Sequence, residues 1–410
     1  MSDLATLDLT DVRHYRRGFP YALFARLRRE APVWWHPAPA GFRSVDAGFW
    51  VLSTYDDVRA ANRDTDTFSA LDGPSLADRP EMRGTMLVSM DGAEHTRQRR
   101  LISAGFTPRM VGRLEEQIRR WAARIVDDAI ARGTCDFVQD VAYQLPMHMI
   151  ADIVGIPVED RRWLFTLTND FLSAGDPEAE LSPEQQLAIQ GEMFAYARAL
   201  GQRKRESPGD DVWTILSTVE VETEDGGRTA LGELELDLFF LLLTLAGSET
   251  TRNAITQGLI ALVEHPEQLE TLRAARTVPE SAVEEIVRWS SPVSYFARRA
   301  TRDTAIRGVP IAAGQLITLW YPSANRDEDV FDAPDRFDIR RTPNEHVAFG
   351  GGGPHYCLGA NLARREIAIL FEELLSRTRR IEILEPAVYS ALSIYNPILV
   401  APKALAVRLS

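Results

Sequence analysis

Cysteine is scarce in this chain of 410 residues, which contains only Cys135 and Cys357. The two lie far apart in sequence, so the chain lacks the disulfide framework that is typical of small secreted domains. Long hydrophobic runs are missing as well. The longest, residues 238–246, contains Thr244 and is much shorter than the ~20 apolar residues that a membrane-spanning helix needs. Both absences favour a reducing cytosol and exclude a membrane span.

Positive charge is in deficit. Lys and Arg number 46 against 59 Asp and Glu, which gives a net charge of −13 and a pI near 5.2. Such a balance disfavours nucleic acid and anionic membranes as partners. Residues 1–15 lack the basic start and apolar stretch of a signal peptide, so we expect a cytoplasmic protein. No linker or repeat divides the chain, so we expect one domain over residues 1–410.

Helical periodicity dominates the rest of the chain and predicts a mainly α fold with a small antiparallel β region. Helical patterns cover residues 21–30, 56–62, 111–132, 138–154, 159–172, 184–205, 232–264 and 279–289. Short strands are expected at 33–35, at 50–52 and within 294–320, and an edge hairpin within 391–409. Residues 206–230 are polar and rich in turn residues, which predicts a connection.

A glycine-rich loop precedes Cys357. Residues 350–353 are all glycine, and a helical pattern begins directly after the cysteine. A thiol at a helix N-terminus favours the thiolate, and a single thiolate without zinc-type spacing suits heme iron. A buried, unreactive cysteine is the alternative. Phosphate binding is disfavoured because no Gly-Lys-Ser/Thr follows.

The helical pattern at residues 232–264 is apolar but is interrupted by residues 246–251, Ala-Gly-Ser-Glu-Thr-Thr. Glu249 follows Leu245 by four positions and Leu242 by seven, so it shares their apolar face. An acid there is costly unless it has a partner. The threonine hydroxyls can bond to the carbonyl four residues earlier and bend the helix. A polar helix end that faces solvent is the alternative.

Two further pairs stand at helical spacing. His95 and Arg99 are four apart, and a shared anion would explain two basic groups side by side. A solvated basic face is the alternative. Glu285 and Arg288 are three apart among apolar neighbours, which favours a buried pair over a surface ion pair.

These motifs together resemble the cytochromes P-450, the heme-thiolate monooxygenases. The family's cysteine loop reads Phe-x-x-Gly-x-His/Arg-x-Cys-x-Gly, and Gly353, His355, Cys357 and Gly359 match it. Phe349 departs from it, because it stands eight residues before the cysteine and Gly350 occupies the usual position. The segment 246–251 is similar to the family's oxygen-activating motif, and residues 285–288 match its Glu-x-x-Arg motif. The resemblance covers nearly the whole chain.

The resemblance implies heme b between the central helix and the helix after Cys357, with Cys357 as the iron ligand. It assigns proton delivery to Glu249 and Thr250 and a buried network to Glu285, Arg288 and Arg336. The predicted cofactor-binding residues are His95, Arg99, Ala246, Arg298, Phe349, Gly350, His355, Cys357 and Gly359, with His95 and Arg99 on one heme carboxylate and Arg298 on the other. Arg299 is adjacent to Arg298 and is the alternative at that position.

The implied activity is insertion of one oxygen atom from O₂ into a C–H bond of an apolar small molecule. A narrower likeness, carried by residues 105–109, 246–253 and 323–327, favours a steroid, branched lipid or terpenoid, with polyketide tailoring as a further possibility. Predicted wall residues are Met86, Leu87, Val88, Phe171, Leu242, Ala246, Val293, Tyr295 and Tyr395. A peroxide-driven peroxygenase and a non-catalytic heme sensor or carrier are the alternatives.

The expected electron donors are a ferredoxin and its reductase, and the expected state is a monomer. Basic residues in segments near the cysteine side would steer an acidic ferredoxin. They are Arg97, Arg100, Arg109, Arg364 and Arg365.

Overall fold

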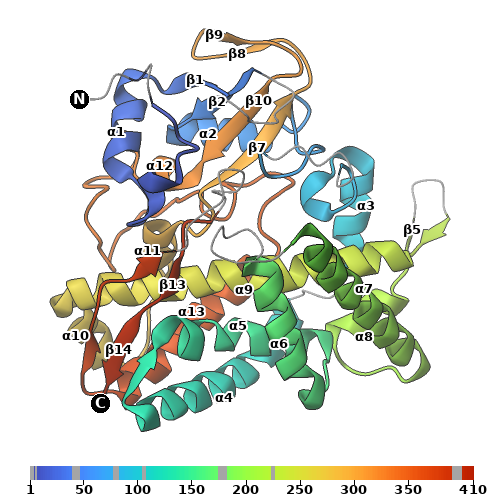
Figure 1. The fold of residues 1–410 in the computed structure, drawn as a ribbon, viewed down its shortest axis with the longest axis vertical. Helices are drawn as coiled ribbons and strands as arrows, with labels where there is room; N and C mark the ends of the chain where they lie inside the picture. The colour runs from blue at the N-terminus through green and yellow to red at the C-terminus, as the bar shows by residue number, and fades with distance from the viewer. Residues whose placement is uncertain are drawn as a thin grey trace.

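A long helix, α9 (Glu233–Glu264), crosses the middle of the molecule in the computed structural model (Figure 1). In this view a β-rich part with strands β1, β2, β7 and β10 lies on one side of α9, and helices α4, α5 and α13 lie on the other. The structure describes residue 4 and residues 7–38, 47–76, 83–103, 108–173, 182–222, 227–389 and 399–410. Tyr395, one of the predicted wall residues, lies outside these ranges.

The helices begin and end as follows: α1 Tyr21–Glu30, α2 Tyr55–Arg63, α3 Gly92–Ser103, α4 Pro108–Arg132, α5 Gln144–Val154, α6 Val158–Ser173, α7 Pro183–Glu206, α8 Val212–Thr218, α10 Pro266–Ala275, α11 Glu280–Ser290, α12 Tyr321–Ala324 and α13 Ala360–Arg377. Shorter turns are η2 Val12–Tyr15, η4 Leu87–Ser89 and the π-helical η5 Val138–Ala142. The strands are β1 Val33–Pro37, β2 Gly48–Leu52, β3 Phe68–Ser69, β4 Thr134–Asp136, β5 Val221–Glu222, β6 Arg228–Thr229, β7 Tyr295–Ala300, β8 Thr304–Ile306, β9 Val309–Ile311, β10 Leu316–Trp320, β11 Ile381–Ile383, β12 Val388–Tyr389, β13 Pro402–Ala404 and β14 Ala406–Leu409.

The largest sheet has the strand order β1-β2-β10-β7-β3. Its pairs are antiparallel except β2–β10, where Trp50 lies opposite Ile317 in a parallel register. Parallel neighbours need a long crossover, and here it runs from residue 52 to residue 316 through most of the helical part. Most of the helical part therefore lies between these two neighbouring strands in the sequence. In β7 successive side chains point to opposite faces, which matters for the two arginines at its centre.

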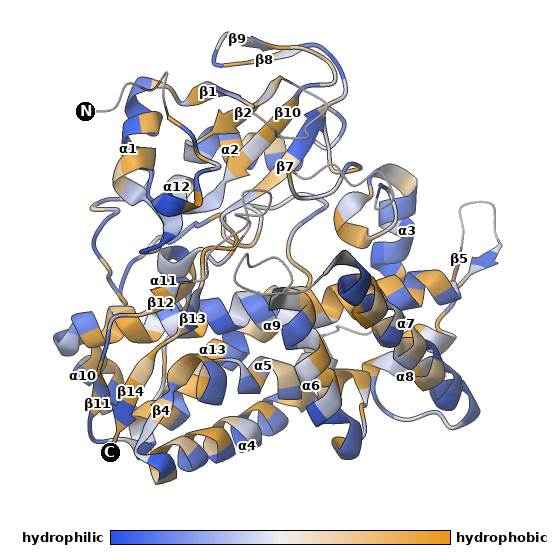
Figure 2. Ribbon diagram, in the orientation of Figure 1, coloured by the Kyte–Doolittle hydropathy of each residue, from blue (hydrophilic) through white to orange (hydrophobic). Residues whose placement is uncertain are grey.

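The helical part forms the largest hydrophobic cluster, and α9 contributes many of its buried residues. Ion pairs hold α4 along α13: Glu115 with Arg365, Arg119 with Glu372 and Glu373, and Asp127 with Arg377. The residue numbers rise together, so the two helices run parallel. Figure 2 shows α9 as mostly hydrophobic in its N-terminal half and more hydrophilic toward its middle. No described helix has an apolar stretch long enough to cross a membrane.

Most predicted elements are present, and the misses have local causes. The connection predicted at 206–230 contains α8, whose N-cap Asp211 accepts a hydrogen bond from the Thr214 N–H at 2.8 Å. The pattern at 138–154 divides into the π-helical turn η5 and α5. The edge hairpin within 391–409 is wrong for the described residues, because β13 pairs with β12 and β14 lies between β11 and β4. The single-domain organisation stays a prediction.

Candidate active site

The glycine loop closes on the end of α2. Gly350, Gly351, Gly352 and Gly353 all have positive φ, between 63° and 98°, which L side chains rarely adopt. A Cβ at Gly353 would lie 3.1 Å from the Arg63 Cα, so the loop also has no room for a side chain there. Both reasons require glycine, and they explain the run of four.

Cys357 lies opposite Phe349 across this loop. The Cys357 N–H donates to the Phe349 carbonyl at 3.0 Å, so the extra residue in the spacing is absorbed within the glycine turn. The Phe349 ring lies 4.5 Å from the Arg364 guanidinium carbon and 6.4 Å from the Tyr356 ring. Although the family's spacing differs by one residue, Phe349 therefore still pairs with Cys357 through the hydrogen bond that closes the loop.

The two cysteines have different surroundings. Cys135 is buried in β4, and burial raises its pKa to about 11. Cys357 is solvent-accessible, yet burial is also the largest influence on its pKa and raises it, although the Gly359 N–H, Arg99 and Arg364 act in the opposite direction. The N–H groups at the N-terminus of α13 favour the thiolate, as expected, but burial outweighs them, whereas a bound metal ion would deprotonate the thiol.

One face of α9 is accessible to solvent although the helix runs through the core. Ala246 is exposed and Leu242 and Thr250 are half-buried, at spacings of four residues along one face. On another side of the helix, a Cβ at Gly247 would lie 3.1 Å from Ile150 of α5. The Thr250 hydroxyl donates to the Ala246 carbonyl at 2.7 Å. This face has the properties of a recess wall.

Glu249 is buried and has one partner. Its Oε2 accepts a hydrogen bond from Arg252 Nη2, whereas its Oε1 has no partner among the described residues. Burial raises the pKa of Glu249, and Arg252 opposes that shift. The Arg252 guanidinium lies 5.9 Å from the Tyr143 ring. Glu249 is therefore held on the Tyr143 side, about 100° around the helix from Thr250.

Basic side chains converge beside the cysteine loop from α3 and β7. His95 is 2% exposed, and its Nε2 has no partner among the described residues. Burial, together with His355 and Arg99, lowers the pKa of His95 to about 4. Arg99 donates to the Tyr356 carbonyl. The His95 and His355 rings lie 4.4 Å apart.

Arg298 is buried without an acid. It donates to the Ala297 carbonyl at 2.8 Å and to Asn62 Oδ1 at 3.1 Å, and its Nε has no partner in the described part of the chain. Arg299 instead pairs with Asp72 and donates to the Gly314 carbonyl. A buried cation needs an opposite charge, so Arg298, rather than Arg299, has the surroundings expected of a carboxylate-binding group.

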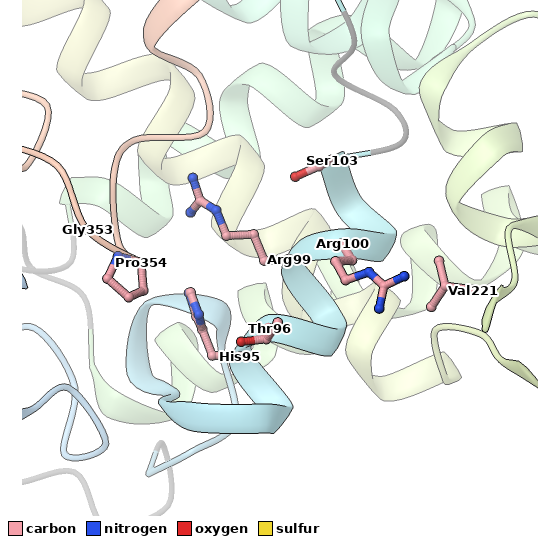
Figure 3. Close-up of a pocket in the computed structure, with 8 residues that line it drawn as sticks. All are labelled: His95, Thr96, Arg99, Arg100, Ser103, Val221, Gly353 and Pro354. Atoms are coloured by element: carbon pink, nitrogen blue, oxygen red, sulfur yellow. The ribbon is translucent and has the colours of Figure 1, made fainter. Parts of the chain in front are cut away.

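The cavity in Figure 3 lies along α3 and has a volume of about 480 Å³. It is lined by His95, Thr96, Arg99, Arg100, Ser103, Val221, Gly353 and Pro354. Arg99 and Arg100 extend in different directions from the helix in this view. Two of the predicted cofactor-binding residues, His95 and Arg99, thus face the same space as the glycine loop.

Asp91 is a site residue that the sequence analysis missed. Its Oδ1 lies 3.1 Å from His355 Nε2, and its Oδ2 accepts from the Ser69 hydroxyl at 2.6 Å and the Ala70 N–H at 2.8 Å. Burial would raise the pKa of Asp91, but these hydrogen bonds together lower it. Its position directly before the helix that carries His95 is the only signal in the sequence, and it is weak.

The buried network behind the site differs from the prediction in one member. Glu285 and Arg288 are both fully buried, and Arg288 donates at 2.7 and 2.8 Å. The third side chain is Arg341, whose Nε lies 3.1 Å from Glu285. Arg336 is wrong in this role: its side chain is exposed and pairs with Asp338, and only its carbonyl accepts from Arg288, at 3.3 Å.

The predicted substrate wall is only partly supported by burial. Val88, Phe171, Leu242 and Val293 are half-buried, whereas Met86 and Leu87 are each 8% exposed. Tyr295 does not fit, because it is fully buried with its ring 5.0 Å from Trp320 and its hydroxyl 3.3 Å from the Leu76 N–H.

The basic surface predicted for a ferredoxin is largely neutralised. Arg97 pairs with Glu94 and Glu235, Arg364 with Glu284, and Arg365 with Glu115. The Arg109 side chain lies outside what the structure describes. Arg100 is exposed and has no ion pair with any described residue.

These residues fit an iron porphyrin. Cys357 offers one soft ligand, and His95 Nε2 and Arg298 Nε are buried polar atoms that lack partners, as carboxylate-binding groups would. No group of three or more His, Cys, Asp or Glu side chains in the described ranges could hold a metal ion by itself. A single thiolate with cationic neighbours matches the ligation of a heme with its two carboxylates.

Comparison with known proteins also indicates a heme-thiolate protein. Residues 191–381 match the family model described as cytochrome P450. The steroid C26-monooxygenase of Rhodococcus jostii is 41% identical over 90% of this chain and 78% of its own length. The methyl-branched lipid omega-hydroxylase of Mycobacterium bovis is 44% identical over 86% of this chain and 83% of its own.

Among solved structures, a Mycobacterium marinum cytochrome P450 in complex with pseudoionone superposes with a TM-score of 0.89. It is 34% identical and covers 100% of this chain and 99% of its own. The chain belongs to the cytochrome P450 family. It is a heme-dependent monooxygenase with the predicted mainly α fold, and it acts with O₂, an apolar substrate and redox partners.

Proposed function

We propose that Cys357 ligates the heme iron and that His95, Arg99 and Arg298 hold the heme carboxylates. The observation that supports this most directly is a buried arginine, Arg298, without an acidic partner, close to the loop that presents an accessible thiol. When bound, the heme supplies the oxygen chemistry, and its thiolate ligand promotes O–O cleavage.

Thr250 and Glu249 have separate parts in proton supply. The Thr250 hydroxyl donates its own proton to Ala246, so toward the recess it acts as an acceptor and holds a proton-donating group in place. Glu249 has a raised pKa and a free Oε1, which suits a group that takes up and releases a proton. Because Arg252 holds its other oxygen, Glu249 must turn about the helix to reach the Thr250 side.

The substrate is an apolar steroid, branched lipid or terpenoid. Three of the predicted wall residues that are not fully buried, Leu242, Ala246 and Val293, are apolar, and apolar side chains favour a hydrocarbon ligand. The names of two relatives, a steroid C26-monooxygenase and a methyl-branched lipid omega-hydroxylase, and the pseudoionone complex point to the same class. Electrons come from a ferredoxin, for which Arg100, which has no ion pair with a described residue, is the main steering charge. A monomeric state stays a prediction.

Two variants test the ligand. Cys357→Ala should lose the thiolate–CO spectrum of the reduced heme, whereas Cys135→Ala, the matched control in β4, should keep it. The reverse result would refute the ligand assignment.

A panel of steroids, fatty acids and terpenoids, titrated while the heme spin state is recorded, tests the substrate class. A spin-state change with polar compounds only would contradict it. Turnover with ferredoxin and its reductase, compared with turnover on peroxide alone, separates a monooxygenase from a peroxygenase.

A further inference from the structure

Asn62 occupies the C-terminal turn of α2 and is 1% exposed. Its amide joins three groups from distant parts of the chain. Nδ2 donates to the Gly350 carbonyl, and Oδ1 accepts from Arg298 at 3.1 Å and from the Tyr321 hydroxyl at 3.3 Å. The opposite amide orientation would place the Asn62 NH₂ group against the Arg298 donor and the amide oxygen against the Gly350 carbonyl, so the hydrogen bonds fix the assignment.

The same helix end supports the glycine loop. A Cβ at Gly350 would lie 3.1 Å from Asn62 Nδ2, and one at Gly353 would lie 3.2 Å from the Asn62 carbonyl. Arg63, the next residue, is exposed and donates to the Gly351 carbonyl at 2.9 Å. Asn62 and Arg63 thus both hold the loop, but in the described structure only Asn62 also contacts Arg298.

We propose that Asn62 is a positioning residue that fixes Arg298 against the cysteine loop, so that the carboxylate-binding arginine and the iron-ligand loop keep one spacing. The inference rests on the heme-thiolate site proposed above. The Arg298 guanidinium has two acceptors among the described residues, the Ala297 carbonyl and Asn62. Without Asn62 the long side chain would regain rotamer freedom that heme binding must then remove.

An amide suits this position because it donates and accepts at once. An aspartate would still accept from Arg298 but would repel the Gly350 carbonyl, and its charge would compete with the heme carboxylates for Arg298. An alanine would leave the Gly350 carbonyl and one Arg298 donor unpaired in a buried place, which is costly. Both substitutions therefore weaken the hold on heme by different routes.

The experiment measures the rate at which the holoenzyme loses heme to excess apomyoglobin, together with the thiolate–CO spectrum. We expect Asn62→Ala and the nearly isosteric Asn62→Asp to release heme about tenfold faster than the unsubstituted protein. Arg63→Gln, the matched control that removes a loop contact without touching Arg298, should stay within about twofold. If Asn62→Ala does not fold, Asn62→Asp carries the test.

A double-substitution cycle with Arg298→Lys separates positioning from general support of the loop. If Asn62 acts through Arg298, adding Asn62→Ala to Arg298→Lys should raise the release rate much less than Asn62→Ala does alone, with the lost Gly350 contact as the remainder. Fully additive effects, or release at the unsubstituted rate in both Asn62 variants, would overturn the inference while a normal thiolate–CO spectrum keeps the proposed function. An unsubstituted protein without that spectrum would refute both.

Discussion

Two buried glutamates, Glu285 and Glu249, differ in how completely they are paired. Glu285 accepts hydrogen bonds from Arg288, Arg341, Asn344 and the Asp338 N–H at 2.7 to 3.1 Å, so both oxygens are occupied. Glu249 is bound by Arg252 through one oxygen, and its other oxygen has no partner in the described part of the chain. A carboxylate whose two oxygens are both fully hydrogen-bonded cannot move or take up a proton without breaking hydrogen bonds that stabilise the fold. A partly paired one can, which separates a structural acid from a chemical one.

The largest expected effect comes from breaking the complete network. Glu285→Gln leaves Arg288 and Arg341 buried without a counter-charge, and we expect it to lower the free energy of unfolding by about 3–5 kcal/mol. Urea unfolding of the holoenzyme measures this. The matched control is Arg336→Ala, whose side chain is exposed and, among the described residues, pairs with Asp338 alone, and it should cost no more than about 1 kcal/mol. If Arg336→Ala lowered the free energy of unfolding more than Arg341→Ala, Arg336 and not Arg341 would be the third member of the network.

Glu366 extends the comparison to an acid in α13 whose Oε2 has no described partner. Burial raises its pKa from 4.5 to about 8. Between these values the unfolded chain ionises while the folded one keeps its proton, so this group's stabilisation is complete below pH 4.5 and is lost as pH rises to about 8. The slope reaches at most about 1.4 kcal/mol per pH unit.

Glu366→Gln should flatten this part of the stability–pH profile. Urea unfolding at several pH values between 5 and 8 measures the change. Glu372→Gln is the control, since that acid is paired with Arg119. A profile that is unchanged in Glu366→Gln would show that this carboxyl does not titrate as its burial indicates.

Thr250→Ala tests the accessible face of α9. Heme binding and the first reduction should persist, but product per reducing equivalent should fall about tenfold or more, because the group that holds the proton donor is gone. Reducing equivalents, product and peroxide are measured together. Thr244→Ala removes a similar hydroxyl, bonded to the Phe240 carbonyl at 2.7 Å but buried, and should leave coupling intact. Unchanged coupling in Thr250→Ala would remove Thr250 from proton supply.

Glu249→Gln should instead slow the whole cycle, because it removes the titrating group itself. Product and consumption should then fall together, with their ratio near that of the unsubstituted enzyme. A selective loss of product would mean that Glu249 and Thr250 act at the same step.

The smallest expected effect is on the surface, where Arg100 has no ion pair within the described ranges and Arg364 is paired with Glu284. Arg100→Glu should slow reduction by ferredoxin a few-fold at low salt, and the difference should shrink as salt screens the charges. Reduction by dithionite should not change. Arg408→Glu in β14 is the control, and equal slowing in both variants would argue against docking beside α3.

The sequence by itself determined the family and most of the helices, and it singled out Cys357, which we propose as the iron ligand. These signals are local: a loop of four glycines before Cys357, or the 3.6-residue period of residues 21–30, which form α1 with the predicted bounds. The interruption of the central helix at residues 246–251 is also a local signal, since helical spacing alone places Ala246 and Thr250 on one face.

Only the tertiary structure decided which neighbours meet. Arg298 and Arg299 are adjacent in a strand and point to opposite faces, and the sheet decides which face is inside. The third member of the buried network is Arg341 and not Arg336, because the path of the chain after Arg336 brings the Arg341 side chain to Glu285. Asn62 lies 288 residues from Gly350, and no local pattern records a hydrogen bond across that distance. Periodicity specifies the faces of single elements, whereas partners for buried polar groups depend on how separate elements pack.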